Sequence, residues 1–137
     1  MLDFMKTMAI ASSGLRAQNG RMRVIAENMA NSSSTATRPG GDPYRRKIVT
    51  FRSDLDRALG ANTVSLGKIQ TDGTDFRTKY EPGHPAADAN GYVKYPNVNE
   101  LIEMNDMREA ERSYQANLNI VSSTRRMVQR TLDLLKG

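Results

Sequence analysis

His84 is the only histidine in the chain and the side chain best suited to acid–base or metal chemistry. Glu81 and Asp88 stand near it, but a metal site needs at least three converging ligands, and the chain has no second His and no Cys to complete one. The prolines on both sides of His84 indicate a rigid loop instead. No nucleophile motif or phosphate-binding glycine loop accompanies it. We therefore expect no catalytic residue, no metal ligand and no cofactor, and the enzyme class is disfavoured.

The sharpest cluster of charge is Arg45, Arg46 and Lys47. Two interpretations stay open: a solvated strand edge that the bases protect from stray pairing, or a contact to an acidic patch on a neighbouring subunit. The net charge of +5 raises a nucleic-acid-binding module as the alternative function. However, the excess charge is spread thinly along the chain, and only Tyr44 flanks the cluster. We expect no nucleic-acid partner, and rank a peripheral membrane helix lower still.

The residue types that position these side chains sort into three parts of the sequence. All eight Met lie in residues 1–30 or 98–137, whereas all five Pro lie in 31–97. Met fills helix faces, and Pro marks turns. This predicts an N-terminal helix over 1–30, a turn-rich insert with short strands over 31–97, and a long C-terminal helix over 98–137. The expected fold class is mainly α: two long terminal helices forming a coiled-coil region, with a small β-hairpin and loop insert between them.

Apolar residues in both terminal segments recur at steps of three and four, which is typical of helices that pack on other helices. Gly14 and Gly20 each weaken the first helix by about 1 kcal/mol relative to Ala. The second helix would be about 55 Å long at 1.5 Å per residue. An apolar stripe usually faces a core within its own chain, but these lengths and the small insert favour burial against other molecules. The predicted assembly seams are Phe4, Met8, Leu15, Met22, Ile25 and Met29 in the first helix, and Leu101, Met104, Tyr114, Leu118, Val121, Val128, Leu132 and Leu135 in the second.

Local signals predict how the elements begin and pair. Asn97 and Glu100 have the spacing of a capping box for a helix that starts near residue 99. Residues 63–71 and 74–80 could pair through the Asp72-Gly73 turn, and Lys47 to Phe51 is a plausible strand. Asn90-Gly91 is a second turn signal, followed by a short strand at 92–95.

Three segments resemble the terminal signatures of bacterial flagellar rod and hook proteins. Ser13 to Gln18 and Ile25 to Asn31 are similar to the amino-terminal signature, and Arg112 to Asn117 to the carboxy-terminal one. Pro43 to Lys47, Tyr80 to Pro85, Ala87 to Val93 and Pro96 to Val98 narrow the likeness to the proximal-rod members. The resemblance covers nearly the whole chain.

This resemblance implies a structural subunit of the periplasmic rod, which transmits torque from the motor to the hook and filament. The terminal helices would form coiled coils along the axis. The implied partners are other proximal-rod proteins, the distal-rod protein, the rod adaptor, copies of the same chain, and the type III flagellar export apparatus during secretion. Such export uses no cleaved signal, and Asp3 stands where a signal peptide would carry a base. We also expect no membrane span, because no apolar run approaches about 20 residues.

Overall fold

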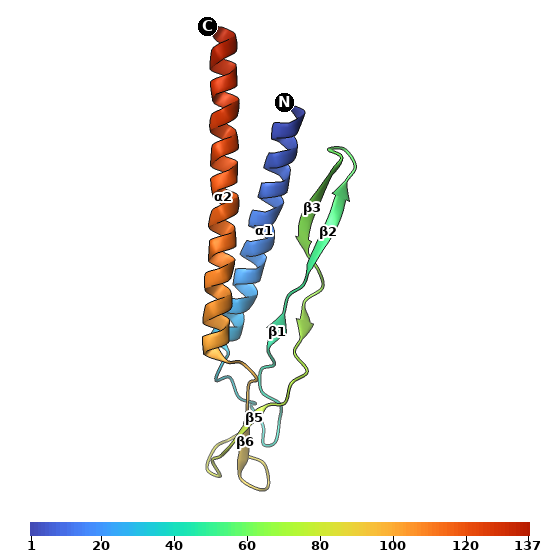
Figure 1. Cartoon of the computed structure of the whole chain (residues 1–137). Helices are drawn as coiled ribbons and strands as arrows, with labels where there is room; N and C mark the ends of the chain where they lie inside the picture. Colours follow the sequence, from blue (N-terminus) through green and yellow to red (C-terminus); the bar gives the residue numbers. More distant parts are fainter. The chain divides into compact units, whose positions relative to one another are not determined.

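The computed structural model describes all 137 residues and contains two helices and six short strands. Figure 1 shows the helices at the two ends of the sequence and the strands between them. The prediction of two long terminal helices packed together, with small β-hairpins between them, is confirmed. In chain order the elements are α1 (Leu2–Ala30), β1 (Lys47–Ile48), β2 (Phe51–Asp56), β3 (Ala61–Leu66), β4 (Gln70–Thr71), β5 (Arg77–Tyr80), β6 (Tyr92–Tyr95) and α2 (Glu100–Lys136).

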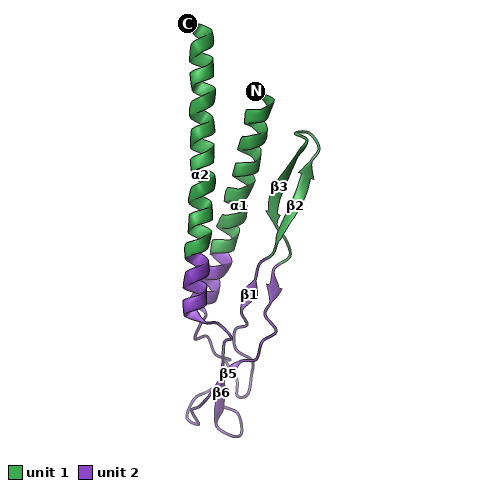
Figure 2. Cartoon of the chain, viewed as in Figure 1, with its two compact units in different colours: residues 1–22, 50–68, 108–137 green, residues 23–49, 69–107 purple.

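The chain divides into two compact units, each built from part of α1, part of the insert and part of α2 (Figure 2). Unit 1 comprises Met1–Met22, Thr50–Lys68 and Arg108–Gly137, and unit 2 comprises Arg23–Val49 and Ile69–Met107. The division of the sequence into an N-terminal helix, an insert and a C-terminal helix as separate domains stays a prediction.

In unit 1, α1 lies between α2 and the β2–β3 hairpin (Figure 1). A Cβ added at Gly14 would lie 2.8 Å from the side chain of Asn117 on α2, and one at Gly20 would lie 2.2 Å from Cδ1 of Leu66 on β3. The two glycines that weaken α1 as an isolated helix therefore allow its two neighbours to approach closely. Arg21 pairs with Glu109 at 3.5 Å, whereas the earlier residue Gly14 lies beside the later residue Asn117, so the two helices run antiparallel.

The β2–β3 hairpin contacts α1 through β3, by a backbone hydrogen bond as well as by the Leu66 side chain. Its strands pair from Phe51↔Leu66 to Asp56↔Ala61, and the Val64 N–H donates to Ser13 Oγ on α1 at 3.1 Å. The outer edge of β2 has no partner strand.

In unit 2, the hairpin predicted through Asp72-Gly73 is wrong. Asp72 Oδ1 accepts the Thr74 N–H at 2.9 Å, which closes a local Asx-turn. The strands on its two sides have separate partners, because β4 pairs with β1 and β5 pairs with β6. The predicted strand from Lys47 to Phe51 is interrupted, since β1 ends at Ile48 and β2 begins at Phe51. The turn at Asn90-Gly91 is confirmed, with β6 directly after it.

The capping box predicted from Asn97 and Glu100 is also wrong. Asn99 caps α2, because its Oδ1 accepts the Leu101 N–H at 3.1 Å. Asn97 Oδ1 accepts the Arg46 N–H at 2.8 Å instead. The Glu100 carboxylate accepts a hydrogen bond from Ser32 Oγ at 2.7 Å. Both side chains thus connect α2 to the rest of unit 2 rather than closing its first turn.

Candidate assembly surface

The predicted seam of α1 is only partly directed into the chain. Ile25 is buried, whereas Phe4, Met8, Leu15, Met22 and Met29 are half-buried. The other buried positions of α1 are small or polar side chains and one valine: Ala11, Ser13, Ala17, Val24 and Asn28.

The predicted seam of α2 splits into two groups. Tyr114, Val121 and Val128 are half-buried. The other five positions are exposed, with exposed fractions of 72% at Leu101, 41% at Met104, 37% at Leu118, 36% at Leu132 and 80% at Leu135. The chain itself therefore leaves much of the apolar seam of α2 in contact with solvent.

Small and polar residues explain this split. Glu103, Ala110, Asn117 and Thr124 recur every seven residues on the inward face of α2, and Ala110 is fully buried. Because Gly14 brings α1 within contact of Asn117, that face has room only for small side chains in unit 1. The larger apolar side chains stand to either side of it. Sequence reasoning did not identify this row as the inward face because it followed apolar residues, although the seven-residue recurrence was a signal that could have found it.

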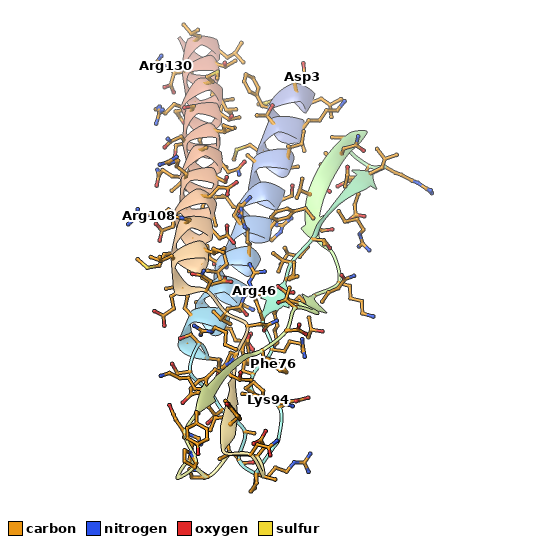
Figure 3. All side chains as sticks on the ribbon, turned by 60° about the horizontal axis from the view of Figure 1, so that its bottom comes forward. Asp3, Arg46, Phe76, Lys94, Arg108 and Arg130 are labelled. Carbon is orange, nitrogen blue, oxygen red and sulfur yellow. The ribbon has the colours of Figure 1, made fainter.

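Outside the predicted seams, the helices expose both charged side chains and further apolar ones. Figure 3 shows Arg108 and Arg130 on the side of α2 that faces away from α1, so that the surface of this helix is mixed rather than uniformly apolar. The additional exposed apolar residues of the helices are Leu2, Met5 and Ile10 on α1, and Ile102, Ile120, Met127 and Leu134 on α2.

Arg46 of the basic cluster, labelled in Figure 3, is held by three carboxylates in unit 2. Its guanidinium bonds Glu103, which is fully buried, and lies 3.3 Å from Asp72 and 3.6 Å from Asp106. Partial burial alone lowers the pKa of Arg46, but the hydrogen bond and charge of Glu103, followed by those of Asp72, raise it overall. The Thr74 N–H, with help from Arg46, holds the pKa of Asp72 below its usual range. The interpretation of Arg46 as a solvated edge residue is therefore wrong.

The flanking bases are also engaged within unit 2. Arg45 donates to the carbonyl oxygens of Asp72 and Thr74 at 2.9 and 3.0 Å, and its guanidinium lies 4.1 Å from the ring centre of Phe76. Lys47 Nζ lies 2.5 Å from Glu27. These partners give no support to a basic stripe free for nucleic acid. A contact from this cluster to an acidic patch on a neighbouring subunit stays a prediction.

Asn28 is the centre of the same polar network, and sequence reasoning did not single it out. Its amide donates to the Lys47 carbonyl at 2.9 Å and to Glu103 at 3.4 Å, and its Oδ1 accepts the Lys47 N–H at 2.9 Å and the Tyr44 hydroxyl at 2.8 Å. Burial, reinforced by the charges of Glu27 and Glu103, raises the pKa of Tyr44 to about 12. Both donors and both acceptor positions of the Asn28 amide are thus used.

The side chain of His84 takes part in holding its own loop together. His84 Nδ1 accepts the Ala86 N–H at 3.0 Å. No group of three or more His, Asp or Glu side chains in the chain is arranged to hold a metal ion. Neither α1 nor α2 contains a stretch apolar enough to span a bilayer.

Comparison with known proteins agrees with this geometry. The family model for the C-terminal region of flagellar basal body rod FlgEFG proteins matches residues 89–134. The flagellar basal-body rod protein FlgC of Agrobacterium fabrum is 57% identical over 128 residues, covering 93% of this chain and 92% of the relative. FlgC of Salmonella typhimurium is 42% identical over 125 residues, covering 91% and 92%. FlgC of Bacillus subtilis is 37% identical over 145 residues, covering 95% and 97%.

Long packed terminal helices and these matches define a structural protein of the bacterial flagellar basal-body rod, which serves motility. Such a protein is not an enzyme, and it assembles with other subunits of the rod. More particularly, the chain belongs to the FlgC family.

Proposed function

We propose that this rod subunit occupies the proximal part of the rod and passes torque onward through the exposed apolar seams of its terminal helices. Its neighbours would be other proximal-rod proteins, the distal-rod protein, the rod adaptor and further copies of the same chain. It would reach the rod through the flagellar export apparatus without a cleaved signal. The terminal helices would associate with those of neighbouring subunits as coiled coils.

The observation that supports this proposal most is the exposed part of the α2 seam. Leu118 and Leu132 stand on a helix that already packs against α1, yet both remain more than one-third exposed. Burial of apolar surface contributes about 25 cal/mol per Å², so a neighbour that covers this seam would stabilise the assembled state. A solitary subunit gains nothing from keeping these side chains in water.

A single charge placed in the seam tests the proposal. Leu118→Asp should prevent incorporation into the rod and abolish swimming, because an unpaired carboxylate would be buried in the subunit contact. The chain should still be exported. Incorporation is measured by immunoblotting purified basal bodies, and export by the amount of chain outside the cytoplasm.

The matched control is Asn119→Asp, which adds the same charge at the neighbouring exposed position of α2. This variant should assemble and swim. Normal swimming of the Leu118→Asp strain would contradict the proposed role of the seam.

A further inference from the structure

An apolar groove opens in unit 1 beside the first turns of α1. It has a volume of about 460 Å³ and is lined by side chains of α1, by Leu59 at the tip of the β2–β3 hairpin and by Val128 of α2. Three of the lining residues are methionines: Met1, which directly precedes α1, and Met5 and Met8 within it. Met side chains are flexible and adapt to the shape of an incoming apolar group.

The last turns of α2 carry exposed apolar side chains of the kind that such a groove accommodates. Every residue from 131 to 136 is exposed, and Leu134 and Leu135 are exposed by 83% and 80%. These two leucines cannot fill the groove of their own chain, because Leu134 lies six residues beyond Val128 on a continuous helix, about 9 Å further along its axis. The groove and the leucines can therefore meet only between two molecules.

The charges beside the two features are complementary. Asp3 and Lys6 stand three residues apart on α1, and Asp133 and Lys136 stand three residues apart on α2. Asp3 lies at the free end of α1 (Figure 3). None of the four has an ion-pair partner within the chain. When α2 of a second molecule runs antiparallel to α1, as within unit 1, Asp133 comes opposite Lys6 and Lys136 comes opposite Asp3.

We propose that this groove receives Leu134 and Leu135 from a second copy of the same chain, an inference that rests on the proposed assembly through the helix seams. The two copies lie parallel and are displaced by about 9 Å along α2. Since the groove and the leucines are different surfaces, the contact is heterologous, and each copy offers both halves to its neighbours. Repeated contacts of this kind build a ring or a helical array.

Disulfide cross-linking tests the contact, because the natural chain has no Cys. One strain produces two forms of the chain, one with Met5→Cys and the other with Leu135→Cys, and its purified rods are treated with a copper–phenanthroline oxidant. A dimer containing both forms is expected, because the proposed contact places Leu135 of one copy in the groove that Met5 of the other lines. A disulfide forms only where the two Cα atoms lie within about 7 Å of each other. The control strain pairs Met5→Cys with Ala116→Cys, an exposed position of α2 remote from its last turn, and should give no dimer.

Rods that contain both cysteine forms but give no dimer would overturn this inference while leaving the proposed function intact. The proposed function has its own test in Leu118→Asp, so the two failures are distinguishable.

Charge reversal provides a second test that needs no cysteine. Lys6→Asp or Asp133→Lys alone should each lower the amount of chain in purified basal bodies by about threefold, as expected for a partly exposed ion pair. The double variant should restore it, because each copy then carries both reversed partners. If Asp133→Lys failed to rescue Lys6→Asp, the occupant of the groove would be a different rod protein and the inference of a second copy would be wrong.

Discussion

The contacts that stabilise the inside of unit 1 differ in kind from those that stabilise the inside of unit 2. Unit 2 depends on polar side chains that reach across the chain, with Asn28, Arg46 and Asn97 each bonding two or more segments. Unit 1 depends on close approach of small residues, as at Gly14, and on few polar contacts between its segments. Most of the exposed large apolar side chains of the chain lie in unit 1.

This difference indicates that the two units of one subunit have different roles. Polar groups in unit 2 find their partners inside the chain, and each such bond requires a defined geometry. Apolar surface in unit 1 has no such geometric requirement and is available to neighbours of varied shape. Unit 2 thus fixes the internal structure, whereas unit 1 supplies the surface for assembly.

Removing the buried carboxylate of unit 2 should have the largest effect. Glu103→Ala leaves Arg46 and Asn28 without their shared partner, and should lower the free energy of unfolding by about 3 kcal/mol. The matched change in unit 1, Glu109→Ala, removes an exposed ion pair with Arg21 and should cost at most about 1 kcal/mol. Urea unfolding of the two full-length variants, followed by circular dichroism, measures both values. Equal midpoints would remove the distinction between the units.

Replacing one asparagine in each unit tests the same difference with smaller expected losses of stability. Asn28→Ala strands the N–H and the carbonyl of Lys47 and should cost about 2 kcal/mol. Asn117→Ala in unit 1 removes a bond only to the Ser113 carbonyl of its own helix, together with the contact of its side chain with Gly14, and should cost less, about 1 kcal/mol.

The Lys47 amide gives a local readout for the same pair of variants. It donates to Asn28 Oδ1, so its hydrogen exchange should accelerate in Asn28→Ala and stay unchanged in Asn117→Ala. Unchanged exchange in both variants would show that Asn28 does not hold this strand.

The smallest expected effect is a pH dependence that arises from Tyr44. Its pKa is about 12 in the folded chain and about 10 in an unfolded one. The folded state therefore binds the phenolic proton more tightly, and this stabilisation is complete below about pH 10 and is lost as the pH rises toward 12. Over this range the natural chain should lose more stability than Tyr44→Phe, while Tyr80→Phe, which alters an exposed ring, should behave as the natural chain does. The tyrosinate absorbance and urea unfolding at each pH provide the measurements.

The fold class could be predicted because helix periodicity is a local property of the sequence. The three- and four-residue steps from Phe4 onward and from Leu101 onward indicated both helices. Strand pairing could not be read in the same way, because Asp72-Gly73 is a turn signal whether or not its flanks pair with each other. Which strands pair depends on contacts between distant segments, such as β2 with β3 and β5 with β6.

The candidate surface was predictable in part for a similar reason. The pattern of apolar residues identified Leu118 and Leu132 as members of an apolar stripe, but apolar residues alone did not show that Ala110 and Thr124 would occupy the inward face in their place. That choice follows from the close packing allowed by Gly14 on a different helix. The roles of Arg45, Arg46 and Lys47 were equally hidden, because their carboxylate and carbonyl partners come from several separate segments.

The unpaired outer edge of β2 has a consequence for the order in which a rod is built. Free strand edges invite extended polypeptide to add on, and a growing structure brings many incompletely folded chains to one place. Arg52 and Asp54, paired at 3.2 Å, place charge along this edge. A chain that added itself here would have to bury or separate these charges, which disfavours misdirected β-aggregation while the helices find their correct neighbours.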